Sequence, residues 1–98
     1  MADRLAGDPR TAVEGLVLRV RGHLARREYA PAKQILGATI AAAPQAVLPR
    51  VLLSHALLQE GLDGGSAERA LRDVLALDPA NAEARSNLAV LLQRQGRV

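Results

Sequence analysis

The residues best suited to chemistry in this sequence are two histidines, His23 and His55, and a serine, Ser54, that precedes the second histidine. A serine nucleophile and its histidine base must face each other, but adjacent side chains on a helix diverge by about 100°. No cysteine and no His-Glu-x-x-His pattern accompanies the histidines, which lie far apart in the sequence. The sequence therefore predicts no catalytic residue, no metal site and no cofactor, and we do not expect an enzyme.

The charged residues do not favour a nucleic-acid or phosphate partner. The net charge is only +3, and acidic residues occur in every segment. The single lysine, Lys33, does not follow a glycine-rich loop, and Gly64-Gly65 is typical of a turn. Almost all basic residues are arginines, which together with abundant alanine and leucine is typical of a high-GC bacterial genome. We therefore expect a bacterial protein that does not bind nucleic acid.

The composition favours a small all-α domain. Of the 98 residues 49% are apolar, yet Tyr29 is the only aromatic residue, so the core must be built from leucine, valine, isoleucine and alanine. No apolar stretch reaches the roughly 20 residues that span a bilayer. The first ten residues lack the apolar region of a secretory signal. We therefore expect no membrane span and a cytoplasmic location.

An internal period organises most of the chain. Pro9, Pro44 and Pro79 are spaced 44 − 9 = 35 and 79 − 44 = 35 residues apart. A fixed period of this size is typical of helical repeat proteins. The same spacing relates further apolar residues, namely Leu18, Leu53 and Leu88, Ala32 and Ala67, Leu36 and Leu71, and Ile40 and Leu75.

The stretch from Ala67 to Gly96 resembles the tetratricopeptide repeat (TPR) family. It has a small residue near the start of a helix, apolar residues in the middle, an Asp78-Pro79 turn, and Leu88 followed by a small residue in the next helix. The TPR period is about 34 residues, so each repeat carries one extra residue, most simply in the turn between its two helices. The resemblance implies an all-α, right-handed α-α superhelix of about five antiparallel helices. Its repeats would cover residues 12–46, 47–81 and, in part, 82–98, after a leader or the tail of a preceding repeat at residues 1–10.

Local signals predict where the helices begin and end. We expect helices at residues 11–26, 29–42, 46–60 and 81–95, and another between the glycine turn and Pro79. Thr11, Ser66 and Asn81 are the expected N-caps, and Gly61 ends the third helix.

The position of the first helix is uncertain by one residue. Counting from Pro9 places Leu18 at the repeat leucine, whereas counting back from Ala32 places Arg19 there. We prefer Leu18, because a buried arginine would need a partner.

The third and the last predicted helices differ in polarity. The third is apolar nearly all round, which is typical of a helix in the middle of a stack. The last is more polar and ends where a TPR would turn into its second helix. It is therefore either a solubilising cap or the cut end of a longer protein.

The resemblance implies a scaffold that binds a peptide or partner segment in a groove lined by the first helix of each repeat. Of the residues at the family's groove positions, His55 is the sharpest candidate, because it is a titratable group amid leucines. Its alternative role is a hydrogen bond inside the fold, and the apolar candidates have the alternative role of core packing. The groove positions are Leu16, Val20, His23, Val51, His55, Leu58, Gln59, Ser86, Val90, Gln93 and Arg94.

The ligand that the sequence favours is an apolar peptide with acidic flanks. The nearby arginines would attract the flanks, whereas Asn87 and Arg94 match only a fragment of the family's carboxylate clamp. Two other functions stay open. The chain could form a homodimer through the terminal helix at Leu91 and Leu92, or it could be an accessory segment of a larger bacterial enzyme such as a glycosyltransferase. The arginines are Arg19, Arg21, Arg26 and Arg27.

Overall fold

The computed structural model describes residues 9–62 and 64–96, with the backbone alone at residues 9–13, and these residues form five α-helices. No strand occurs among them, which confirms the all-α prediction. In the same part of the chain, no helix combines the length and apolar character needed to cross a bilayer. The helices are α2 (Pro9–Ala25), α3 (Tyr29–Ala42), α4 (Val47–Glu60), α5 (Gly64–Leu77) and α6 (Ala82–Arg94).

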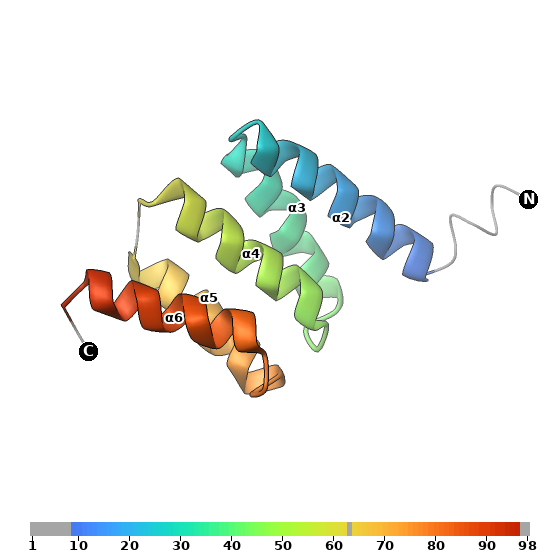
Figure 1. Ribbon diagram of the computed structural model, residues 1–98. Coiled ribbons are helices and arrows are strands. Elements are labelled where there is room, and N and C mark those ends of the chain that lie inside the picture. Colours follow the sequence, from blue (N-terminus) through green and yellow to red (C-terminus); the bar gives the residue numbers. More distant parts are fainter. Residues whose placement is uncertain (1–8, 63, 97–98) are drawn as a thin grey trace, which may run out of the picture.

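Each helix packs against the next one along the chain, and α2 also contacts α4. Figure 1 shows α2, α4 and α6 running in one direction across the front of the view, with α3 and α5 returning behind them. An ion pair reinforces one of these contacts, because Lys33 Nζ on α3 donates to Glu60 Oε1 at the end of α4 at 2.7 Å. The three helices in front form one layer, and this layer carries all of the predicted groove residues.

Helix α4 contributes to two separate apolar cores. Leu52 and Ala56 lie in a first core with α2 and α3, whereas Val51 and Leu58 pack against a second core formed by α5 and α6. The nearly all-round apolar character of α4 is therefore explained, since apolar neighbours lie on two of its sides. The first core consists of Val20, Leu24, Ala32, Leu36, Leu52 and Ala56. The second core consists of Ala67, Leu71, Val74, Ala84 and Leu91.

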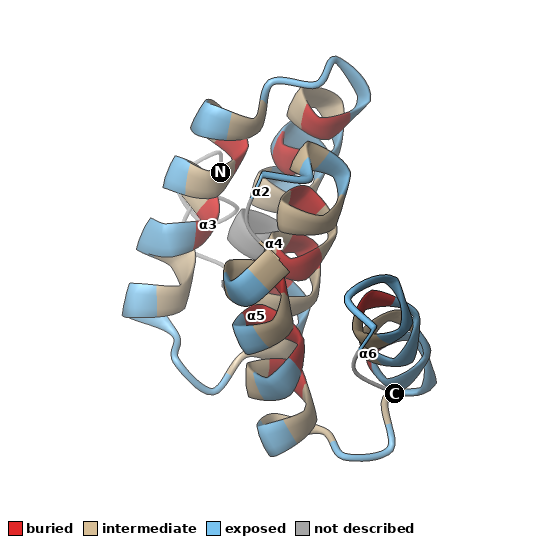
Figure 2. Cartoon of the chain, turned by 90° about the vertical axis from the view of Figure 1, so that its left-hand side faces the viewer, coloured by how far each residue is buried: buried red, intermediate tan, exposed pale blue. Residues whose placement is uncertain are grey.

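Small residues let the helices approach closely where no aromatic ring is available to fill the core. Ala32 and Ala56 are fully buried, and Figure 2 shows the buried positions along the inner sides of the helices. Ser54 is also buried, and its hydroxyl donates to the carbonyl oxygen of Val51 at 2.6 Å. This bond satisfies a polar group that would otherwise be costly to bury.

The helix boundaries agree with the sequence at some caps and differ at others. Asn81 is the N-cap of α6, and its Oδ1 accepts a hydrogen bond from the Ala84 amide at 2.9 Å, as predicted. Thr11 and Ser66 are not N-caps, because α2 begins at Pro9 and α5 begins at Gly64. Proline is well accommodated in the first turn of a helix, which permits the earlier start of α2. Of the predicted leader at residues 1–10, residues 1–8 lie outside the described residues, and residues 9 and 10 belong to α2.

The prediction that Leu18 occupies a buried position is wrong, because 70% of its surface is exposed. Helix α2 is the first of the described helices, so none precedes it to cover Leu18, as α2 and α3 cover Leu52 on α4. The helix ends also show a different offset between the repeats. Arg27 and Gly61 both adopt the left-handed conformation after α2 and α4, and they are 61 − 27 = 34 residues apart. On that offset Val20 matches Ser54, since 54 − 20 = 34, and both residues are 1% exposed. Helix α3 begins two residues after Arg27, whereas α5 begins three residues after Gly61, so the extra residue lies between α4 and α5.

Core packing can be tested by truncating one buried leucine and one exposed leucine. Leu71 is fully buried in the second core, so Leu71→Ala should lower the free energy of unfolding by about 2–5 kcal/mol, through lost burial and a residual cavity. Leu18→Ala removes the same atoms from an exposed site and should change it by less than about 0.5 kcal/mol. Urea unfolding followed by circular dichroism measures both values. Equal losses would contradict the burial described here.

Backbone strain at the end of α2 gives a second prediction. Arg27 has φ 59°, a region that costs a residue with a side chain about 1–2 kcal/mol and costs glycine little. We therefore expect Arg27→Gly to raise the free energy of unfolding by about 1 kcal/mol. Gly61→Ala should lower it by a similar amount, because the added methyl group meets nothing nearer than the Leu58 carbonyl oxygen at 4.0 Å and only the backbone is strained. Thermal unfolding of both variants checks the opposite signs.

Candidate functional site

An open hollow of about 310 Å³ lies between α2 and α4. Its apolar lining includes Leu24 and Leu52, which are members of the first core. Arg21 and Gln59 are exposed at its edge, and His55 is half-buried. The complete lining is Arg21, Leu24, Ala25, Leu52, His55 and Gln59. The hollow therefore combines an apolar floor with polar and cationic edges, which is a common composition of binding sites.

A second open hollow of about 240 Å³ adjoins the first at the end of α2. The two share Leu24, Ala25 and Gln59, and the second extends to Arg27 and Tyr29 at the turn into α3. Tyr29 also packs against the first core. Together the hollows form one depression that follows the carboxyl-terminal half of α2, and we call it the α2/α4 groove.

The α2/α4 groove is bordered by positive charge. Arg21 and Arg27 line it, and no aspartate or glutamate is among the residues that line either hollow. Within the described side chains, neither guanidinium forms an ion pair, whereas the neighbouring Arg26 binds Glu28 through Nε at 3.0 Å. Two arginines are therefore available for an anionic group that enters the groove.

His55 has a partner inside the fold as well as a place in the groove. Its Nε2 lies 2.6 Å from Glu83 Oε1, so the contact joins α4 to the first turn of α6. The side chain of His55 is 28% exposed and that of Glu83 is 59% exposed, so this contact lies at the surface. Ser54 points elsewhere, since its hydroxyl bonds within α4. The adjacent serine and histidine therefore do not interact as a nucleophile and base would.

His23 lies outside the groove lining. Its Nδ1 is 2.8 Å from Glu28 Oε1 in the turn between α2 and α3, and Arg26 binds the same oxygen. These hydrogen bonds hold the pKa of the Glu28 carboxyl below its ordinary 4.5, and the bond with His23 has the larger effect. Among the residues that the structure describes, no three histidine, aspartate or glutamate side chains come together in a way that could hold a metal ion.

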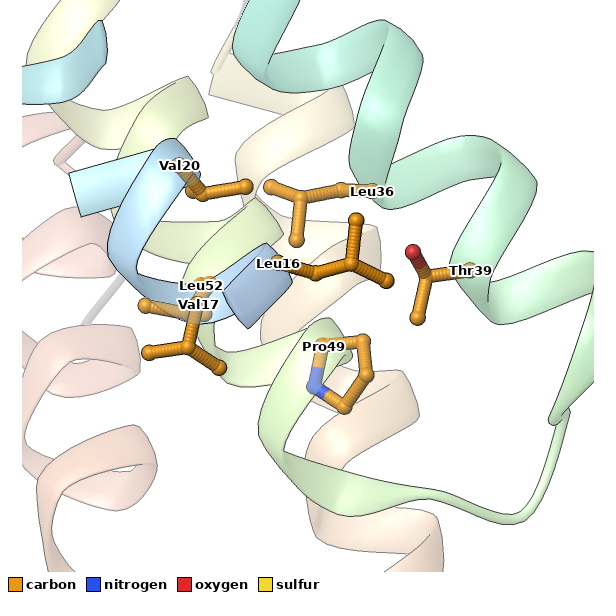
Figure 3. A pocket seen from close by; sticks show the side chains of 7 residues that line it. All are labelled: Leu16, Val17, Val20, Leu36, Thr39, Pro49 and Leu52. Atoms are coloured by element: carbon orange, nitrogen blue, oxygen red, sulfur yellow. The ribbon is translucent and has the colours of Figure 1, made fainter. Parts of the chain in front are cut away.

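The remaining sequence candidates are distributed over three other places. Leu16 and Val20 line a separate apolar gap of about 10 Å³ where α2, α3 and α4 meet, which Figure 3 shows from close by. This gap is too small for a ligand, and Val20 belongs to the core. Val51 and Leu58 pack against the second core. The candidates on α6 are exposed and lie outside both hollows, namely Ser86, Val90, Gln93 and Arg94.

Of the predicted groove residues, His55 and Gln59 line the α2/α4 groove, whereas none of the predicted residues of α2 does. Arg21 and Arg27 were named only as charges that could attract a ligand, and Leu24 and Ala25 were not named as site residues. The signal that could have found them is the 34-residue offset between Arg27 and Gly61, because on that offset Leu24 matches the predicted groove residue Leu58.

The Glu28 contacts make part of the stability depend on pH. A carboxyl whose pKa is lower in the folded state stabilises the fold above its unfolded pKa, and this stability is lost as the pH falls through the folded pKa. We therefore expect the melting temperature of Glu28→Gln to fall less than that of the parent when the pH is lowered from about 5.5 to about 3. Glu14→Gln, exposed on α2 and without an ion pair among the described side chains, is the matched control and should follow the parent. Parallel loss in the parent and Glu28→Gln would refute the role of Glu28.

Comparison with known proteins adds no family to this description. No family model matches the chain, and no curated protein matches it. The similarity to the TPR family therefore depends on the residue pattern around Asp78-Pro79 and stays a prediction.

Proposed function

We propose that this chain is a non-catalytic interaction module that binds a short segment of another protein in the α2/α4 groove. The pattern around Asp78-Pro79 and the layer formed by α2, α4 and α6 support a helical array of TPR type, with two repeats and the first helix of a third. Peptide recognition by such arrays uses a preformed surface, which keeps the entropic cost of binding low. We also propose, from the arginine-rich composition, that the protein is bacterial.

The observation that carries the proposal is the pairing of an apolar floor with unpaired arginines. Leu24 and Leu52 provide apolar surface for a ligand side chain, and Arg21 and Arg27 lie on the same groove without an ion pair in the described part of the chain. An apolar side chain flanked by aspartate or glutamate matches both features. Burial of the apolar side chain would supply affinity, and the charges would orient the segment.

Nucleic acid fits this surface less well. Binding to a nucleic-acid backbone depends on many cations arranged along it, and affinity grows with the number of phosphates that are neutralised. Only two arginines line the groove, Tyr29 is the only aromatic residue for base stacking, and the floor is aliphatic. A protein segment is the better match to this chemistry.

Self-association through the terminal helix has less support than binding in the groove. Leu91, which the sequence offered as an exposed apolar residue of that helix, is 8% exposed and belongs to the second core. Leu92 is half-buried, and Val90 is the large exposed apolar residue of α6. A change at Leu91 would therefore disturb folding as well as any contact between copies.

A labelled peptide tests the proposed function. The probe is a fluorescein-labelled peptide with one leucine between glutamates, capped at both ends, and its control carries glutamines in their place. We expect the acidic peptide to bind more tightly, and Arg21→Glu to weaken it by roughly three- to tenfold, because an attraction becomes a repulsion. Fluorescence anisotropy gives the dissociation constants.

The matched control for this experiment is Arg69→Glu. Arg69 is exposed on α5, lines neither hollow, and forms no ion pair among the described side chains, so the variant has the same net charge as Arg21→Glu. It should leave the dissociation constant nearly unchanged. Equal weakening by both variants would mean that the peptide responds to net charge alone, and the groove would not be its site.

A further inference from the structure

The contact between His55 and Glu83 places a carboxylate of the chain itself beside the α2/α4 groove. His55 is a lining residue, and Glu83 Oε1 lies 2.6 Å from its Nε2. No aspartate or glutamate lines the groove itself, so Glu83 brings a negative charge to a lining that otherwise has none. A ligand carboxylate that reached His55 would meet this resident carboxylate first.

The backbone of Glu83 is fixed beside His55, but its side chain is free to rotate away. It lies in the first turn of α6, between the N-cap Asn81 and the buried Ala84, so its backbone is fixed. Its side chain is 59% exposed, so rotation into water costs little burial. Displacement of Glu83 therefore requires a side-chain movement only, with α6 remaining packed on α5.

We propose that Glu83 is an internal competitor, which occupies His55 in the free protein and yields it to the carboxylate of a ligand in the α2/α4 groove. This inference rests on the proposed function and names its regulation. The groove then binds acidic segments more weakly than its cationic groups alone would. Weak or mismatched carboxylates do not displace Glu83, so the contact raises the threshold for binding.

The experiment compares the parent with Glu83→Gln and uses the same fluorescein-labelled acidic peptide. Glutamine keeps the size of the side chain but removes its charge, so the dissociation constant should fall by roughly two- to fivefold, the range of an exposed ion pair. The glutamine-substituted peptide, which has no carboxylate to compete with, should bind both proteins equally.

Asp73→Asn is the matched control. Asp73 Oδ2 on α5 lies 3.7 Å from Arg50 Nη1 on α4, so this variant also removes one negative charge from an ion pair between α4 and another helix. Neither residue lines the groove. The dissociation constant should stay within about 1.5-fold of the parent, which separates competition from a general gain in positive charge.

A second background isolates the role of the imidazole. In His55→Gln the shared group is gone, so adding Glu83→Gln should give no further gain in affinity. The long-range ¹H–¹⁵N spectrum of His55 gives an independent readout, because the signals of its ring nitrogens should change on adding either the peptide or Glu83→Gln. A gain that persists without His55 would overturn the inference.

The possible outcomes separate this inference from the proposed function. If Arg21→Glu weakens binding but Glu83→Gln does not change it, the groove is the site and Glu83 is not a competitor. If Asp73→Asn tightens binding as much as Glu83→Gln does, the competition is likewise refuted. If neither the parent nor Glu83→Gln binds the peptide, both proposals fail, whereas binding by Glu83→Gln alone supports both.

Discussion

The fold depends on the position of α4 between two apolar cores. Leu52 on one side and Val51 and Leu58 on another bring α2 and α3 together with α5 and α6 in one structure. A polar residue on either side would leave one core open to water and separate the two halves. The same arrangement determines where binding can occur, because the part of α4 that neither core covers carries His55 and Gln59.

Local signals made the helical class and several boundaries predictable. Asn81 caps α6 and Gly61 ends α4 because the chemistry of each residue acts on its own backbone and needs no knowledge of the fold. Thr11 and Ser66 have the same chemistry but lie inside helices that begin two residues earlier. A capping residue can take its preferred role only where the chain stops being helical, and the residues before it decide that.

The candidate site was less predictable, because it depends on how α2 is rotated. The 34-residue offset moves the predicted groove positions of α2 by one residue, and so by about 100° around the helix, to Val17, Arg21, Leu24 and Ala25. It does not account for the exposure of Leu18, which on this offset matches the buried Leu52, whereas no described helix precedes α2 to cover Leu18. The offset is 34 residues up to Gly61, and the extra residue follows it. The proline period cannot locate that insertion, because Pro9 and Pro44 both precede it and are nevertheless 35 residues apart. The prediction of His55 and Gln59 did not depend on the position chosen for α2, and both residues line the first hollow.

The place of Tyr29 has a consequence for observing this protein in solution. It is the only aromatic residue of the chain, and it lines the end of the groove beside Arg27 and Gln59. Near-ultraviolet absorption and intrinsic fluorescence therefore arise from one phenol ring, without the background of tryptophan that obscures such signals in most proteins. The optical spectrum of the unlabelled chain thus reports on a single location, where the first core meets the groove.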